Sequence, residues 1–159
     1  MPKIDLAAVP VSSGTTYPDP FAERCLGLRR QKLGDVVGLD QFGVNLLRLP
    51  PGQWSSQRHW EHGEDEFVWV LEGEVVLVTD AGEEVLRAGD CAGFKSGVHD
   101  AHHFQNRSHA DALLLEVGTR SEPNAGATYP DIDLRLDAGD PGYAHKDGAR
   151  YPVTGRRSA

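Results

Sequence analysis

The chain has 159 residues and a net charge of −8, with 39% hydrophobic and 25% charged residues, as expected for one soluble globular domain with its own core. This charge argues against a general nucleic-acid binder, which needs a basic surface, but it leaves room for a local basic pocket that takes an anion. No apolar run is long enough to cross a bilayer, and residues 1–9 lack the pattern of a secretory signal.

The two cysteines, Cys25 and Cys91, lie far apart in the sequence and match no zinc or redox spacing. We interpret both as reduced thiols of a cytoplasmic protein. We therefore expect neither a membrane nor a nucleic acid among its partners, and a small molecule as its substrate.

Glycine and proline, at 18 and 10 residues, divide the chain into short segments. This punctuation favours many short strands joined by tight turns, and so an all-β sandwich or barrel. Residues 1–40 are expected to form an arm whose short strands pack on the barrel. Within the arm, Arg29, Arg30 and Lys32 form a small basic cluster, which we interpret as a solvated face.

Alternating apolar residues predict the strands of the barrel itself. Residues 67–71 and 75–79 flank Glu72 and Gly73 and predict a hairpin, and a second hairpin joins 75–79 to 83–87. Further strands are expected at 41–49, 91–94 and 112–117. Residues 119–159 read as a polar C-terminal extension with one apolar patch at 129–134.

Four groups that can bind a metal or move a proton, His59, Glu61, His62 and Glu66, run directly into the apolar segment 67–71. Ionisable groups are costly to bury unless they are paired or bound to a metal, so this juxtaposition is unusual. Alternate residues of a strand share a face, which places His59 and Glu61 together and His62 on the other side. The alternative is a solvated loop between two strands.

A second histidine cluster follows at residues 99–106, and the two clusters together resemble the cupin superfamily of small β-barrels. Its first motif has the form Gly, His-x-His, Glu, Gly, and Glu61 stands where the second His is usual. Its second motif has the form Gly, Pro-x-Gly, His, Asn, and Lys95 stands where Pro is usual. The matching residues are His59, Glu66 and Gly73 in the first motif and Gly89, Gly97, His102 and Asn106 in the second. Segments 65–68, 89–94 and 129–133 resemble a bacterial subgroup of single-domain cupins, some of them sugar-phosphate-isomerase-like.

The resemblance implies a double-stranded β-helix with residues 41–118 as the barrel core, often a homodimer, and a divalent metal at the barrel mouth. By position, the implied ligands are His59, Glu61, Glu66 and His102. Such a mixed nitrogen and oxygen site suits Fe, Mn, Ni or Zn. The apolar patch at 129–134 adds to the expectation of a homodimer.

The remaining histidines have plainer interpretations. His103 faces away from His102 in a strand and is expected to be structural or exposed. His62 is expected to face solvent, unless a local bulge exchanges it with Glu61.

Several functions stay open at this stage. The leading one is a metal-dependent isomerase or lyase acting on a sugar-like or carbonyl substrate, with Glu61 as the catalytic base if it is not a ligand. An iron dioxygenase would use His59, Glu66 and His102. A non-catalytic binding or sensor barrel is a third possibility. A fourth is a barrel without its metal, in which Glu61 pairs with Arg58 or a neighbouring histidine.

Overall fold

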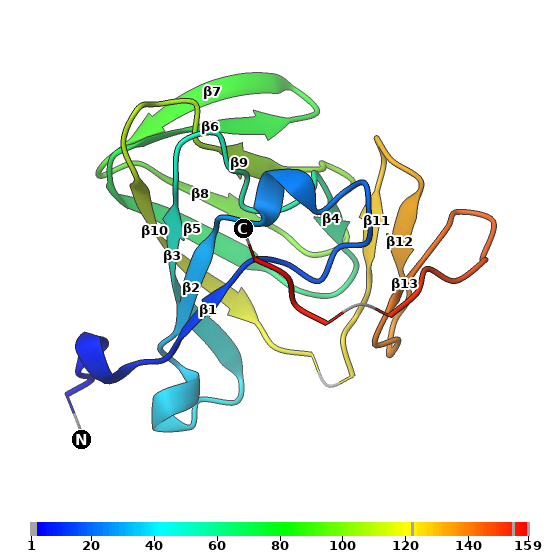
Figure 1. Ribbon diagram of the computed structural model, residues 1–159, viewed down its shortest axis with the longest axis horizontal. Helices are drawn as coiled ribbons and strands as arrows, with labels where there is room; N and C mark the ends of the chain where they lie inside the picture. The colour runs from blue at the N-terminus through cyan, green and yellow to red at the C-terminus, as the bar shows by residue number, and fades with distance from the viewer. Residues whose placement is uncertain (1–2, 122, 154, 159) are drawn as a thin grey trace.

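The structure is a computed structural model that describes residues 3–121, 123–153 and 155–158. Short antiparallel strands dominate it, and they form a barrel (Figure 1). The helices of the described residues are three-residue 3-10 turns: η1 (Leu6–Ala8), η2 (Glu23–Cys25) and η3 (Asp35–Val37). None of them has the length and apolar character needed to span a membrane.

One wall of the barrel is a six-stranded sheet in the order β1-β2-β3-β10-β5-β8. Its two longest strands, β3 and β10, pair along their whole length, from Ala112 opposite Leu49 to Thr119 opposite Phe42. The short strands β1 and β2 of the N-terminal arm extend this sheet at one edge. The strands are β1 (Val11–Ser13), β2 (Arg29–Lys32), β3 (Phe42–Leu49), β10 (Ala112–Thr119), β5 (Glu66–Glu72) and β8 (Cys91–Phe94).

Two smaller sheets complete the barrel. The first has the order β7-β6-β9, and the second has the order β13-β12-β11-β4 and lies to one side of it (Figure 1). Their strands are β6 (Glu74–Thr79), β7 (Gly82–Arg87), β9 (His103–Gln105), β4 (Trp60–Glu61), β11 (Ala127–Tyr129), β12 (Leu134–Leu136) and β13 (Tyr143–Ala144).

The expected hairpin between residues 67–71 and 75–79 is wrong. Strand β5 pairs with β10 and β8, whereas β6 pairs with β7 and β9, so consecutive strands lie in different sheets. The link between them is Gly73, whose φ of 78° suits glycine, and whose Cβ, if present, would lie 2.8 Å from the carbonyl oxygen of Asp111. The chain therefore crosses from one sheet to the other instead of folding back. The second expected hairpin, β6 with β7, is confirmed.

The core fills the space between the sheets. Alternation along β3, β5 and β10 turns Leu47, Val70 and Leu114 inward, all with no exposed surface. Tyr129 and Leu134, from the apolar patch at 129–134, are buried in the same core. Because these apolar residues are buried in the chain's own core, they are not available to a second copy, and the patch gives no support to a homodimer.

Candidate active site

The four residues that the motifs single out, His59, Glu61, Glu66 and His102, line one cavity of about 450 Å³. Strand β5 supplies Glu66 and β4 supplies Glu61, while both histidines lie just outside regular strands. Their convergence is a tertiary event, because 36 positions separate Glu66 from His102.

Backbone hydrogen bonds fix the two histidines side by side. The amide of His59 donates to the carbonyl of His102 at 3.2 Å, and the amide of His102 donates to the carbonyl of His59 at 2.8 Å. Phe94 stacks on the His102 ring with centroids 3.5 Å apart, and Tyr129 stacks on the His59 ring at 5.4 Å. The imidazoles are thus held in orientation by both backbone and ring contacts.

Each imidazole faces a carboxylate. The Nε2 atom of His102 lies 3.0 Å from Oε2 of Glu66, and Nε2 of His59 lies 3.8 Å from Oε1 of Glu61. Burial raises the pKa of Glu66, but His102 and His59 outweigh it, so the pKa of this carboxyl lies below its usual range. Burial lowers the pKa of His59, but Glu61 and Glu66 outweigh it and the pKa is raised. The surroundings therefore favour the ionised carboxylate of Glu66 and the protonated imidazole of His59.

The chemistry of this donor set fits a divalent metal. The Nδ1 atom of His59 lies 2.9 Å from the carbonyl of Gln57, and Nδ1 of His102 lies 3.4 Å from that of Asp100, the type of contact that directs Nε2 of a ligand histidine to its metal. Yet among the described residues, no three His, Cys, Asp or Glu side chains are arranged to hold a metal ion. The four groups instead form two His–Glu pairs, which an ion would have to replace.

His62 and His103 lie outside the cavity lining. His62 is exposed, with Nε2 2.9 Å from the hydroxyl of Thr128, and Glu61 reaches the cavity without any exchange with it. His103 is buried with Nδ1 3.0 Å from the carbonyl of Ser56. Burial lowers the pKa of His103 to about 4. These placements give His62 a surface position and His103 a structural one.

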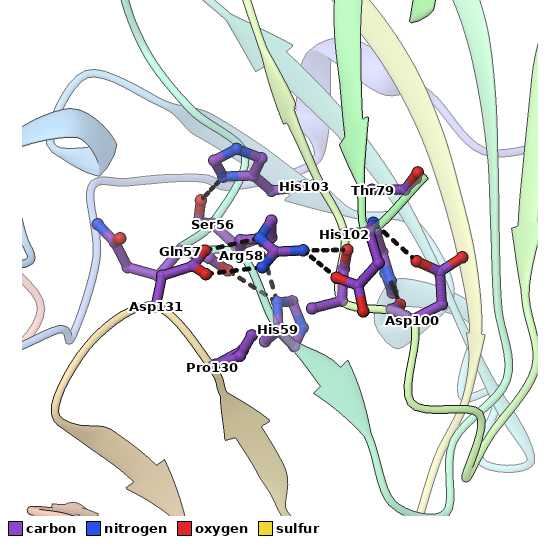
Figure 2. Close-up of polar contacts among 12 residues, drawn as sticks. Ser56, Gln57, Arg58, His59, Thr79, Asp100, His102, His103, Pro130 and Asp131 are labelled. Carbon is purple, nitrogen blue, oxygen red and sulfur yellow. Dashed lines mark hydrogen bonds and ion pairs between the residues drawn. The ribbon is translucent and has the colours of Figure 1, made fainter. Parts of the chain in front are cut away.

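Arg58 pairs with carboxylates other than that of Glu61. Its guanidinium pairs with both carboxylate oxygens of Asp131 at 2.6 Å (Figure 2). It also pairs with Asp80. The pairing with Asp131 ties the turn between β11 and β12 to the segment before His59, and it helps to hold Tyr129 over the His59 ring. Glu61 thus pairs with His59 and not with Arg58.

The cavity also contains an ion pair whose two residues belong to neither sequence motif. Arg30 of β2 donates Nε and Nη2 to the two carboxylate oxygens of Glu116 on β10, at 2.8 and 3.0 Å. One signal could have found it: Glu116 is the only charged residue in the apolar run 112–117. Tyr17 and Tyr143 also line the cavity, and no local pattern marks them.

A small antiparallel barrel with imidazoles and carboxylates in its cavity defines a class of proteins, and comparison with known proteins agrees. The cupin domain family matches residues 45–118. The crystal structure of a cupin-superfamily sugar phosphate isomerase from Silicibacter pomeroyi shares 44% identity over 96% of this chain and 98% of its own, with a TM-score of 0.88.

Two more distant structures share the fold. A protein from Acidithiobacillus ferrooxidans, provisionally assigned as a sugar phosphate isomerase, is 27% identical over 81% of this chain and 83% of its own, with a TM-score of 0.69. The polyketide cyclase RemF from Streptomyces resistomycificus is 20% identical over 92% of this chain and 85% of its own, with a TM-score of 0.62, and indicates the fold alone. Comparison with curated protein sequences finds no match.

This chain belongs to the cupin superfamily. The prediction of an all-β double-stranded β-helix is thereby confirmed.

Proposed function

We propose that this cupin is an isomerase that interconverts the aldose and ketose forms of a small phosphorylated sugar. The observation that carries the proposal is the pair of His–Glu contacts in one cavity of about 450 Å³. The substrate class comes from the 44% identity to a sugar phosphate isomerase over nearly the whole chain.

The chemistry requires a base and an acid near one carbonyl group. The base removes the proton from the carbon next to the carbonyl while an acid protonates the carbonyl oxygen, which gives an enediol. The proton then returns to the former carbonyl carbon while the other hydroxyl gives up its proton to the deprotonated acid, which forms the new carbonyl and restores both groups. Glu61 is a partly exposed carboxylate at the cavity and serves as the base. Where no metal is bound, His59, whose pKa is raised beside Glu61 and Glu66, serves as the acid toward the oxygen; as a metal ligand it would give up this role to the bound ion.

A divalent metal is part of the proposal. His59, Glu66 and His102 would hold it, and Glu61 would be either a fourth ligand or the free base. An ion of the Fe, Mn, Ni or Zn type, when bound, supplies polarisation of the carbonyl. The supporting observation is the orientation of both Nδ1 atoms toward backbone carbonyls, which leaves both Nε2 atoms facing the carboxylates.

Turnover and metal content test these proposals separately. We expect the purified protein to convert members of a panel of aldose phosphates, and Glu66→Ala, His59→Ala and His102→Ala each to lose most of the bound metal in elemental analysis. Unchanged metal content in all three variants would contradict the ligand set. Iron-dependent oxygen uptake without isomerisation would instead favour the dioxygenase alternative.

The two roles of Glu61 are separated by two substitutions. If Glu61 is the base, Glu61→Gln retains the metal while kcat falls by about 10²- to 10⁴-fold. If it is a ligand, Glu61→Gln loses metal, and Glu61→His restores it by supplying a third imidazole. Full activity in Glu61→Gln would contradict both roles.

A further inference from the structure

The cavity that holds the His–Glu pairs has two ends of opposite charge. Glu61, Glu64 and Glu66 line it on the side of β4 and β5. Besides Arg30, which is paired with Glu116, three further cations line it. They are Lys32 from β2, Arg120 after β10 and Arg156 near the C-terminus, and we call these three residues the basic rim. The rim is a local exception on a protein of net charge −8.

The charge of the basic rim is only partly neutralised. Lys32 Nζ lies 3.9 Å from one oxygen of Asp35, and Arg120 pairs with the other oxygen, so two cations share one carboxylate. Arg156 donates Nη1 to the carbonyl of Gly14 at 2.6 Å and has no ion-pair partner among the described residues. These pairs are substantially exposed at the opening, where a dissolved anion can reach them.

We infer that the basic rim is the subsite for the phosphate group of the substrate, an inference that rests on the proposed function. A phosphate monoester carries a charge of about −1.5 to −2 near pH 7, and its oxygens accept charge-assisted hydrogen bonds from Arg and Lys. The rim thereby selects a phosphorylated sugar over the free sugar. The carbonyl end of the same molecule lies at the His–Glu end of the cavity.

Two glycines line the sheet between the two ends, and the Arg120 side chain of the basic rim reaches over one of them, Gly43, where an added Cβ would lie 3.6 Å from Nε. On the inner face of the six-stranded sheet, Gly43 of β3 pairs with Gly118 of β10, and Gly118 pairs with Glu66 of β5. Strands β2 and β5 are separated by three inter-strand steps of about 4.8 Å, which places their backbones about 14 Å apart along the sheet. The long side chains of Lys32 and Glu66 shorten that span, so one small extended molecule reaches both ends.

The carboxylate of Asp35 would compete with phosphate for two cations of the basic rim, Lys32 and Arg120. Its carboxylate holds Lys32 and Arg120 in the absence of another anion, and a bound phosphate must displace it or share both cations with it. Removing that negative charge should therefore strengthen phosphate binding, whereas removing either cation should weaken it. Opposite effects from adjacent residues distinguish a phosphate site from general destabilisation.

The test is calorimetric titration of the intact protein with inorganic phosphate, which needs no turnover. We expect Lys32→Gln and Arg120→Gln each to weaken binding by about tenfold, and Asp35→Asn to strengthen it by a similar factor. The matched control is Arg48→Gln on β3, because the Arg48–Asp111 pair is equally exposed but lies outside the cavity lining. Equal phosphate affinity in wild type, Lys32→Gln, Arg120→Gln and Asp35→Asn overturns the inference.

A second arm separates this inference from the proposed function. If sugar phosphates are isomerised, Lys32→Gln should raise KM by about tenfold with a smaller change in kcat, and the KM of the wild type should rise with salt. If Lys32→Gln and Arg120→Gln both turn over sugar phosphates with an unchanged KM, the proposed isomerase activity stands and the inferred phosphate subsite is wrong. If phosphate binding follows the expected pattern but no sugar phosphate is isomerised, the phosphate subsite stands and the proposed isomerase activity is wrong.

Discussion

The two faces of the six-stranded sheet reverse the usual distribution of polarity near the cavity mouth. An antiparallel sheet commonly has apolar residues toward the core and polar residues toward solvent. Here the inner face carries Arg30, Glu116 and Glu66 toward the mouth. The outer face exposes Phe67, Trp69 and Leu71 on β5, each about 40% accessible. Both faces thus depart from the ordinary pattern, the inner face at the cavity and the outer face along β5.

The inner face buries charged side chains, whereas the outer face exposes apolar ones, and each is accommodated in a different way. On the inner face, burial of charge is offset by direct pairing, as in the bidentate Arg30–Glu116 contact. On the outer face, register places Trp69 beside Leu115 and Phe67 beside Val117, and β3 adds Leu46 and Val44 in the same two rows. Contiguous apolar surface of this kind on a monomer marks an interaction site.

We propose that the expected homodimer forms across this outer face, sheet against sheet. One row of the sheet runs from Arg29 on β2 through Arg48 and Leu113 to Glu72 on β5. Among the described residues, Arg29 and Glu72 have no ion-pair partner. A two-fold axis parallel to the strands brings the arginine end of one copy against the glutamate end of the other. The face is therefore complementary to a second copy of itself.

The largest expected effect is on stability, from breaking the inner ion pair. Arg30→Met leaves Glu116 as a buried, unpaired carboxylate and should lower the free energy of unfolding by about 3 kcal/mol. Arg48→Met, which breaks the exposed outer pair with Asp111, should cost less than about 1 kcal/mol. Denaturant titrations of both variants measure the difference. Equal losses would mean that the two faces are energetically alike.

An intermediate effect is expected from pH at His103, whose side chain is buried. The pKa of His103 is about 4 in the folded protein because of burial, against about 6.5 when unfolded. The unfolded state therefore binds more protons between these values, and stability falls as pH drops from 6.5 to 4. We expect a loss of about 2 kcal/mol between pH 8 and pH 5.

His103→Asn isolates this contribution, because it removes the titrating ring and keeps an N–H donor near the carbonyl of Ser56. His59 has a raised pKa, which changes stability with pH in the opposite direction. Its contribution is the same in both proteins, so it cancels when the unfolding free energy of the variant is subtracted from that of the wild type. The dependence on pH should be shallower in the variant when both proteins are unfolded in denaturant. Parallel curves for the two proteins would contradict a buried, neutral His103.

The smallest expected effect is on association. Trp69→Glu places a charge within the apolar part of the outer face and should weaken the dimer at least tenfold, which corresponds to about 1.4 kcal/mol. Light scattering across a micromolar concentration range measures it, with Glu84→Ala, on the exposed strand β7 of another sheet, as a control. A monomeric mass for the wild type would contradict the dimer itself.

The strands and the candidate residues could be predicted from the sequence because both depend on local periodicity. Alternation along 67–71 and 112–117 marks each strand and its buried side, and motif spacing singles out His59, Glu61, Glu66 and His102, which the structure brings to one cavity. Alternation also places Glu61 and His62 on opposite sides, as they lie in the structure.

Pairing partners and distant neighbours were decided only by the tertiary structure. Periodicity marks a strand but not the strand beside it, so Gly73 reads as a hairpin turn although it links two sheets. Arg30 and Glu116 are 86 positions apart, and Lys32, Arg120 and Arg156 come from three remote segments. Their contacts depend on how the barrel closes, because closure brings residues together that no local pattern relates.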